Sequence, residues 1–201
     1  MSRARIVVDS TGVKVYGEGE WKVRTHGVSK RRTWRKLHLC VDEKTHEIIA
    51  AAATENSVAD CQVFPELLAG INGSIEQISA DGSYDKRGVY QTIREREILK
   101  AAIPPRKNAR IWQHGNSKKD RLIRDENLRA VRKKGRKRWK EEIGYHRRSL
   151  SETAVFRFKT IFTEKLKSRK IENQFSEMAI KCAALNQMTH LGMPDSYKAA
   201  A

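Results

Sequence analysis

The chain has 201 residues, with 41 Lys and Arg against 24 Asp and Glu, which gives a formal net charge of +17. Its length and its 39% of hydrophobic residues suffice for one core of ordinary size and exclude a wholly disordered chain. No stretch approaches the roughly 18–20 uninterrupted apolar residues of a membrane span. No apolar signal-peptide segment follows Met1 either, so we expect a cytoplasmic protein.

The positive charge points to a polyanionic partner, because unbalanced charge of one sign opposes compaction unless a ligand offsets it. A basic but inert surface, or a nucleic-acid binder without chemistry, is the alternative. Cys40, Cys61 and Cys182 form no C-x-x-C pair, and the six His show no zinc-binding spacing. A metal in this protein would therefore need oxygen ligands.

In the first part of the chain the pattern predicts three strands. Residues 6–8 read as a short buried strand that ends in a turn at residues 9–12, and residues 13–32 as a loop or irregular hairpin. Apolar and polar residues alternate over residues 37–41, which predicts a half-buried strand, and residues 48–54 form the next strand. Three strands so close in sequence predict an antiparallel meander.

Helices and strands alternate in the rest of the chain. Their predicted bounds are helix 60–68, strand 75–80, helix 87–97, strand 101–103, helix 120–132, helix 150–166 and helix 172–189. Residues 106–140 form a basic insertion of weak periodicity, and the C-terminal helices occupy about 150–191. This order predicts one domain over residues 1–201, with a mixed five-stranded sheet flanked by helices on both faces. A ribonuclease-H-like α/β fold has this arrangement, and from the pattern alone other α+β folds remain open.

Three carboxylates are candidates for chemistry. Asp9 and Asp81 each follow an apolar strand, and Glu152 lies near the start of the long helix. Acids at the ends of strands lie at the rim of a sheet, where water and ligands have access. Asp is also a common turn residue, so for Asp9 or Asp81 alone a purely structural turn remains open.

Four polar residues share one side of the helix that carries Glu152. At about 100° per residue, Tyr145, Arg148, Glu152 and Lys159 lie within about 60° of one another if the helix begins early enough. The apolar stripe of this helix occupies another sector: Leu150, Ala154, Phe158 and Ile161. An ion pair between Arg148 and Glu152 on a solvated helix would contribute only about 0.3–0.5 kcal/mol and would explain neither Tyr145 nor Lys159.

The spacing Tyr145-x2-Arg148-x3-Glu152-x6-Lys159 resembles the Tyr-Arg-Glu-Lys signature of bacterial insertion-sequence DDE transposases, of the insertion sequence five and four type. Asp9–Gly12 resembles their first aspartate block and Ala80–Asp85 their second. Trp34–His38 and Gly144–Ser149 resemble motifs of the subgroup named after insertion sequence five. The resemblance extends from about residue 6 to residue 196.

The resemblance implies that Asp9, Asp81 and Glu152 form the catalytic triad and hold two Mg²⁺ ions, for which Mn²⁺ can substitute. It implies DNA cleavage at the ends of the element, followed by attack of the freed 3′-hydroxyl on target DNA. The residues expected to contact DNA are Tyr145, Arg148, Lys159, Arg147, Arg35 and Lys36. The implied partner is double-stranded DNA, bound by a homodimer in the bacterial nucleoid, with no membrane and no small-molecule substrate.

Other residues have two interpretations each. Asp85 is expected to cap the N-terminus of the following helix rather than to act in catalysis. The basic runs 30–32, 35–36 and 132–140 are candidate phosphate tracks. Trp112 and Trp139 either stack on unpaired bases or pack the insertion onto the domain, and packing is favoured for each one.

The chain begins only eight residues before Asp9, so we expect it to lack the upstream DNA-binding region that family members usually carry. We therefore expect weak, sequence-tolerant and salt-sensitive DNA binding. Two other functions remain open. One is a non-catalytic DNA-binding or dimerising fragment that modulates an intact transposase. The other is a different ribonuclease-H-like nuclease, such as a junction resolvase, against which the Tyr-Arg-Glu-Lys spacing argues.

Overall fold

The computed structural model describes residues 3–15, 34–113 and 120–192. Its strands are β1 (Ala4–Val15), β2 (Trp34–Asp42), β3 (Ile48–Glu55), β4 (Ile75–Ser79), β5 (Lys100–Ala102) and β6 (Lys165–Leu166). Its helices are α2 (Asp60–Ala69), α3 (Arg87–Glu95), α4 (Ile123–Lys134), α5 (Arg136–Glu142), α6 (Ser149–Phe162) and α7 (Ile171–His190). Two 3-10 turns complete the description: η1 (Gly82–Tyr84) and η2 (Tyr145–Arg148).

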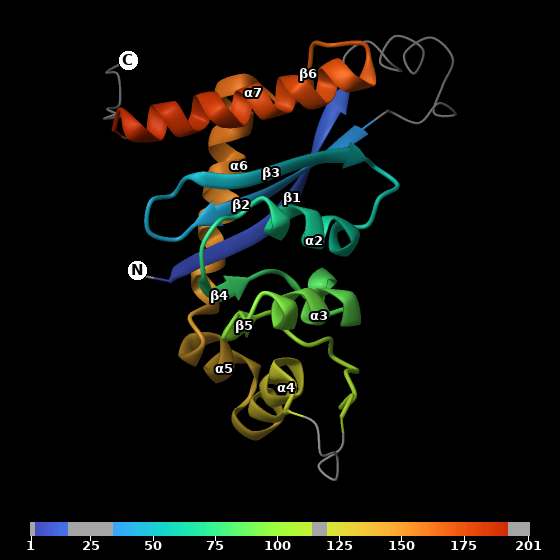
Figure 1. The fold of residues 1–201 in the computed structure, drawn as a ribbon, viewed down its shortest axis with the longest axis vertical. Helices are drawn as coiled ribbons and strands as arrows, with labels where there is room; N and C mark the ends of the chain where they lie inside the picture. Colours follow the sequence, from blue (N-terminus) through green and yellow to red (C-terminus); the bar gives the residue numbers. More distant parts are fainter. Residues whose placement is uncertain (1–2, 16–33, 114–119, 193–201) are drawn as a thin grey trace, which may run out of the picture.

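The strands form one mixed sheet in the order β3-β2-β1-β4-β5, with β6 paired to the far end of β1 (Figure 1). β1, β2 and β3 are antiparallel, whereas β4, β5 and β6 run parallel to their neighbours. The predicted meander and mixed sheet are therefore confirmed, with β6 as an additional short strand. In Figure 1, α7 crosses the sheet at the β3 edge, and α4 and α5 lie beyond β5.

β1 is longer than predicted and passes through the expected turn. Residues 9–12 pair with β2, whose antiparallel partners extend from Ile6 to Lys14 of β1. The predicted end of the strand at Val8 is wrong, because β2 supplies these continuous partners. On its other edge β1 pairs with β4 only as far as Val7 and with β6 from Lys14. Residues 8–13 thus form a gap in the pairing on that edge.

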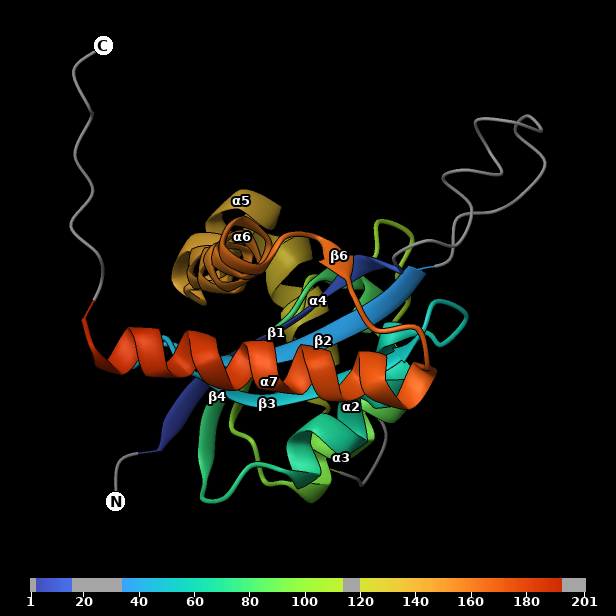
Figure 2. The ribbon, with the colours of Figure 1, turned by 90° about the horizontal axis from the view of Figure 1, so that it is seen from above.

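Helices cover both faces of the sheet. One core cluster joins the strands to α2 and α3, around Ile6, Phe64 and Ile78. The second joins them to α6 and α7, around Leu39 and Phe158. Figure 2 shows α6 and the α2–α3 pair on opposite sides of the strands. Residues 37–41 are buried at every position, so the half-buried strand was a wrong prediction.

α6 ends earlier than predicted. Phe162 is its last residue, and Thr163 follows in a left-handed conformation with φ of 65°. The chain then extends, and Lys165 and Leu166 form β6 instead of a further helical turn. The buried side of α6 consists of Ser151, Ala154 and Phe158. Ile161, expected in the apolar stripe, is 44% exposed.

The basic insertion contains two helices rather than one. The helix predicted over 120–132 is α4, and α5 follows after Gly135, whose φ of +85° favours glycine. A buried Arg124 joins the insertion to the sheet domain, because its Nε donates to Asp85 Oδ1 at 2.9 Å. Asp85 also accepts a hydrogen bond from the backbone N–H of Arg106. The N-cap position of α3 is Lys86, so the capping role predicted for Asp85 is wrong.

The mixed sheet flanked by helices has the ribonuclease-H-like α/β arrangement expected from the sequence. Among the described residues, no helix is long and apolar enough to cross a membrane.

Candidate active site

Strand register brings two of the three predicted acids side by side. Val7 on β1 pairs with Ser79 on β4, and the strands are parallel. Asp9 and Asp81 each lie two residues beyond this pair. Adjacent strands are about 4.8 Å apart, so both aspartates emerge at the same part of the sheet, where β4 has ended and β1 is unpaired on that edge.

Asp9 is partly buried, with 17% of its side chain exposed. Its Oδ1 accepts a hydrogen bond from the backbone N–H of Ser10 at 2.9 Å. Its Oδ2 accepts one from Arg148 Nη1 at 2.9 Å and one from Ser151 Oγ at 3.1 Å. Burial raises the pKa of Asp9 above its usual range, although the hydrogen bonds and Arg148 oppose the shift, and the charge of Asp81 adds to it.

Glu152 and Arg148 reach this place from the start of α6. Gly144, with φ of 72° and ψ of 28°, takes a left-handed conformation that turns the chain from α5 into η2. The Arg148 guanidinium then contacts two carboxylates, because Nη2 donates to Glu152 Oε1 while Nη1 donates to Asp9. Arg148 thus links a central strand to a helix 139 residues further along the chain.

Asp81 and Tyr145 complete the cluster. Asp81 caps η1, because its Oδ1 accepts the backbone N–H of Ser83 at 2.8 Å. Tyr145 lies in η2 instead of on the long helix, which begins later than the sequence argument required. Burial raises the pKa of the Tyr145 phenol, Arg148 lowers it, and the charges of Asp81, Asp9 and Glu152 raise it further. Tyr145 and Arg148 are therefore both within electrostatic reach of all three acids.

The donor chemistry of this cluster suits a hard divalent cation, because carboxylate oxygens are the ligands that Mg²⁺ prefers. The positions of the side chains in this structure, however, do not form a site for such a cation. Within the described ranges, no three His, Cys, Asp or Glu side chains converge as a metal-binding group. The cation between Asp9 and Glu152 is instead the guanidinium of Arg148.

The family described as "Transposase DDE domain" matches residues 2–187. The chain belongs to the transposase DDE domain family. Among solved structures, the chain is similar to a piggyBac transposase in a synaptic complex with hairpin DNA, at 16% sequence identity and a TM-score of 0.36. That similarity covers 55% of this chain and 24% of the other, so this chain matches about a quarter of that protein.

In this DDE-domain chain, Lys159 and Arg147 lie near acids other than Asp9, Asp81 and Glu152. Lys159 is two helical turns beyond Glu152, or about 10 Å along α6. The hydrogen bond with Lys14 lowers the pKa of Glu164, and the charge of Lys159 adds to this shift. Arg147 is 60% exposed and lies 3.6 Å from the buried Glu43 carboxylate. Arg147 therefore points toward the β2–β3 turn, whereas its neighbour Arg148 points to the acids.

The structure does not join Arg35 or Lys36 to the acid cluster. Both lie on β2 and have internal partners. Arg35 Nε donates to Gln174 on α7 at 2.9 Å, whereas Lys36 Nζ donates to the carbonyl of Val58 at 2.8 Å and contacts Asp60. These contacts hold helices onto the sheet. The basic run 30–32 lies outside the described residues.

The two tryptophans pack inside the protein. Trp139 is 3% exposed, and its ring centroid lies 6.4 Å from that of Tyr145. Trp112 stacks on the guanidinium of Arg124 at 4.0 Å and meets Tyr90 edge-on. The packing interpretation that the sequence favoured matches both positions. Trp139 on α5 therefore packs against Tyr145 and joins the basic insertion to η2.

Ser151 was missed by the sequence argument. Its side chain is fully buried, and its Oγ contacts both Asp9 Oδ2 and the carbonyl of Arg148, the latter at 2.8 Å. The available signal was a polar residue in the buried row of α6, three and seven positions before Ala154 and Phe158. A buried polar residue requires a hydrogen-bond partner, and this partner is a predicted catalytic acid.

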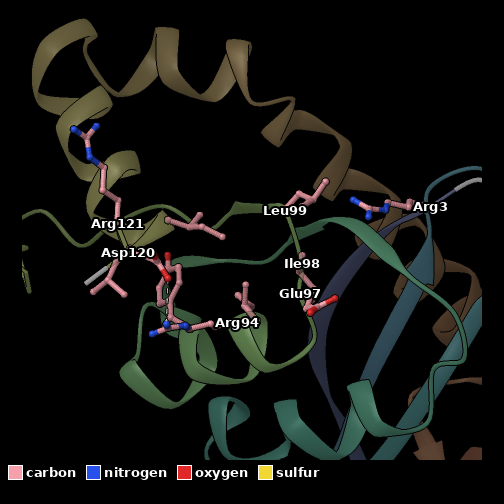
Figure 3. Close-up of a pocket in the computed structure, with 11 residues that line it drawn as sticks. Arg3, Arg94, Glu97, Ile98, Leu99, Asp120 and Arg121 are labelled. Atoms are coloured by element: carbon pink, nitrogen blue, oxygen red, sulfur yellow. Dashed lines mark ion pairs between the residues drawn. The ribbon is translucent and has the colours of Figure 1, made fainter. Parts of the chain in front are cut away.

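A hollow of about 590 Å³ lies away from these acids, between α3 and the start of α4 (Figure 3). Isoleucine and leucine side chains line it, with Arg94 and Asp120 paired at 3.5 Å on one side. None of Asp9, Asp81 or Glu152 is among its lining residues. The site is therefore assigned from its side-chain chemistry and not from the shape of the surface.

Proposed function

We propose that the chain is the catalytic domain of a DDE transposase that cleaves double-stranded DNA at the ends of its element and joins the freed 3′-hydroxyl to target DNA. The observation that carries this proposal is the bridge from Arg148 to Asp9 and Glu152, beside Asp81. Arg148 contacts Asp9 on β1 and Glu152 on α6, and the charge of Asp81, just past β4, also acts on it. Groups with pKa values shifted by burial and by specific charged partners are candidates for a functional site, and Asp9 and Tyr145 have such shifts.

In this proposal, Asp9, Asp81 and Glu152 would hold two Mg²⁺ ions, or Mn²⁺ in their place, through carboxylate oxygens. Such ions would activate an attacking water or 3′-hydroxyl and would stabilise the leaving oxygen. The protein residues hold the DNA backbone in line, and no covalent enzyme intermediate is needed.

The cationic side chains of the site have separate tasks in this mechanism. Arg148 offers a planar fork suited to bidentate contact with a phosphate, and Lys159 and Arg147 offer point contacts further along the backbone. Tyr145 closes the side of the site next to α5. The exposed basic residues of α4 and α5 extend the positive surface away from the acids: Arg132, Lys133, Lys137 and Arg138. Assembly of two copies on DNA in the bacterial nucleoid belongs to the same proposal.

The test is nicking of supercoiled plasmid, together with transfer of a labelled duplex bearing a free 3′-hydroxyl, in Mg²⁺ or Mn²⁺. Asp9→Asn and Glu152→Gln should abolish both reactions. Asp120→Asn is the matched control, because this acid is 92% exposed and outside the cluster. Nicking that survives either site substitution would disprove the proposed site. Salt-sensitive DNA binding without nicking in any sample would favour the regulatory-fragment alternative.

A further inference from the structure

We propose that Arg148 is an internal counter-ion that competes with metal ions for Asp9 and Glu152 until DNA draws it away. This inference rests on the proposed function, because it assumes that these acids are metal ligands. It adds a role for Arg148 beyond phosphate contact: the same side chain holds the site closed in the absence of DNA.

The geometry shows that Arg148 spans two acids at once. Its Nη1 lies 2.9 Å from Asp9 Oδ2, and its Nη2 donates to Glu152 Oε1. A guanidinium normally uses its two parallel N–H groups on a single carboxylate. In this site it divides them between acids from different elements, so it occupies the space between their oxygen atoms.

Asp9 Oδ1, Asp9 Oδ2 and Glu152 Oε1 already accept hydrogen bonds in this arrangement. Asp9 Oδ1 accepts from Ser10 N–H, and Asp9 Oδ2 accepts from both Arg148 and Ser151. A Mg²⁺ ligand must approach to about 2.0–2.1 Å, and the positive guanidinium would repel such an ion. A metal ion can therefore bind Asp9 Oδ2 and Glu152 Oε1 together only after Arg148 releases at least one of them.

Without Arg148 the acids would repel each other. The charges of Asp9, Glu152 and Asp81 all act on its guanidinium, so Arg148 is the positive centre of the cluster. Its side chain is 21% exposed, which leaves an edge accessible to an incoming phosphate. A DNA phosphate can replace the carboxylates as its partner, so DNA binding and metal binding should favour each other.

The direct test is Mn²⁺ binding by the full chain without DNA, measured from the electron paramagnetic resonance signal of free Mn²⁺. Arg148→Gln should bind Mn²⁺ about 10-fold more tightly than the wild type. Arg157→Gln is the matched control, because it removes one positive charge from α6, the helix of Glu152, but its side chain contacts Thr189 and not the cluster. It should change the dissociation constant by less than about 2-fold.

A second variant keeps the test valid if Arg148→Gln fails to fold, which circular dichroism would reveal. Arg148→Lys retains the charge but has one ammonium group that cannot span both acids. We expect a tightening of about 2- to 5-fold. Mn²⁺ binding that is unchanged or weaker in the folded Arg148 variants, or equally tighter in Arg157→Gln, would overturn the inference.

The two proposals fail in different ways. If Asp9→Asn and Glu152→Gln abolish Mn²⁺ binding while the Arg148 variants do not strengthen it, the competition is disproved and the metal site stands. If neither acid substitution affects Mn²⁺ binding, the proposed metal site itself is wrong.

Discussion

Two buried carboxylates of this protein, Asp85 and Glu43, differ in whether a cationic partner compensates their burial. Asp85 is 6% exposed and has a guanidinium 2.9 Å away, whereas Glu43 is 4% exposed and its oxygens accept no hydrogen bond from the described residues. Arg147 approaches Glu43 only to 3.6 Å. The charge of Asp85 is compensated by a hydrogen-bonded guanidinium, whereas that of Glu43 is not. Removing the charge of Glu43 should therefore raise the stability of the protein, and removing the partner of Asp85 should lower it.

Glu43→Gln should stabilise the protein at neutral pH. Burial raises the pKa of Glu43, and the charges of Asp42 and Glu76 add to the shift, whereas Arg147 and Arg5 oppose it. An acid whose folded pKa is raised destabilises the fold once the pH exceeds that pKa, and has no such effect below its ordinary pKa. We expect a gain of about 1 kcal/mol in the free energy of unfolding at pH 7 and none near pH 3. Urea denaturation of the variant and the wild type at pH 7 and at pH 3 measures this difference in the free energy of unfolding. A variant less stable than the wild type at pH 7 would contradict the expected effect of Glu43.

Arg124→Met should destabilise the protein by about 3–5 kcal/mol, because it leaves Asp85 and Asp125 charged and buried without their partner. It should also loosen the packing of Trp112, whose ring lies against this guanidinium. Arg138→Met is the matched control. Its side chain is 72% exposed and pairs with Glu142, so a change below about 1 kcal/mol is expected. If urea denaturation gives the same loss of stability for Arg124→Met and Arg138→Met, the buried ion pair does not stabilise the protein more than an exposed one.

At the scale of elements, α6 positions Glu152 through its buried side. Phe158→Ala removes a fully buried ring that packs against Phe162 and the second core cluster. We expect a loss of about 3–5 kcal/mol in stability. Phe156→Ala on the same helix is the control, because that side chain is 68% exposed and should change stability by less than about 0.5 kcal/mol. Similar losses in thermal or urea unfolding would mean that α6 does not pack as described.

The order of elements could be predicted from the sequence because strand and helix periods are local properties of the chain. The bounds that failed depend on distant partners. β1 continues through residues 9–12 because β2 pairs with it, and α6 ends at Phe162 where β6 joins β1. The spacing that links Arg148 to Glu152 is local and was predicted, whereas the contacts of both Arg148 and Ser151 with Asp9 require the folded sheet.

At the scale of the whole molecule, the net charge of +17 predicts the salt dependence of DNA binding. Each neutralised phosphate releases counter-ions, so about four to six contacts should weaken binding roughly 100- to 2,000-fold between 50 and 200 mM salt. Fluorescence anisotropy with a short labelled duplex measures this slope. The double variant Lys133→Gln with Lys137→Gln should reduce the slope by about two contacts if the α4–α5 surface follows the backbone. A flat response to salt would contradict electrostatic binding.

In the proposed function, Asp9, Asp81 and Glu152 act as one unit on DNA. Groups that act as a unit have non-additive effects, because losing one member already disables the site. The direct measurement is the single-turnover nicking rate, at saturating protein and Mn²⁺, for Asp81→Asn, Glu152→Gln and the double variant. We predict that each single variant is at least about 1,000-fold slower than the wild type and that the double variant is no slower than either. A single variant that nicks at the wild-type rate, or losses that multiply in the double variant, would contradict the account.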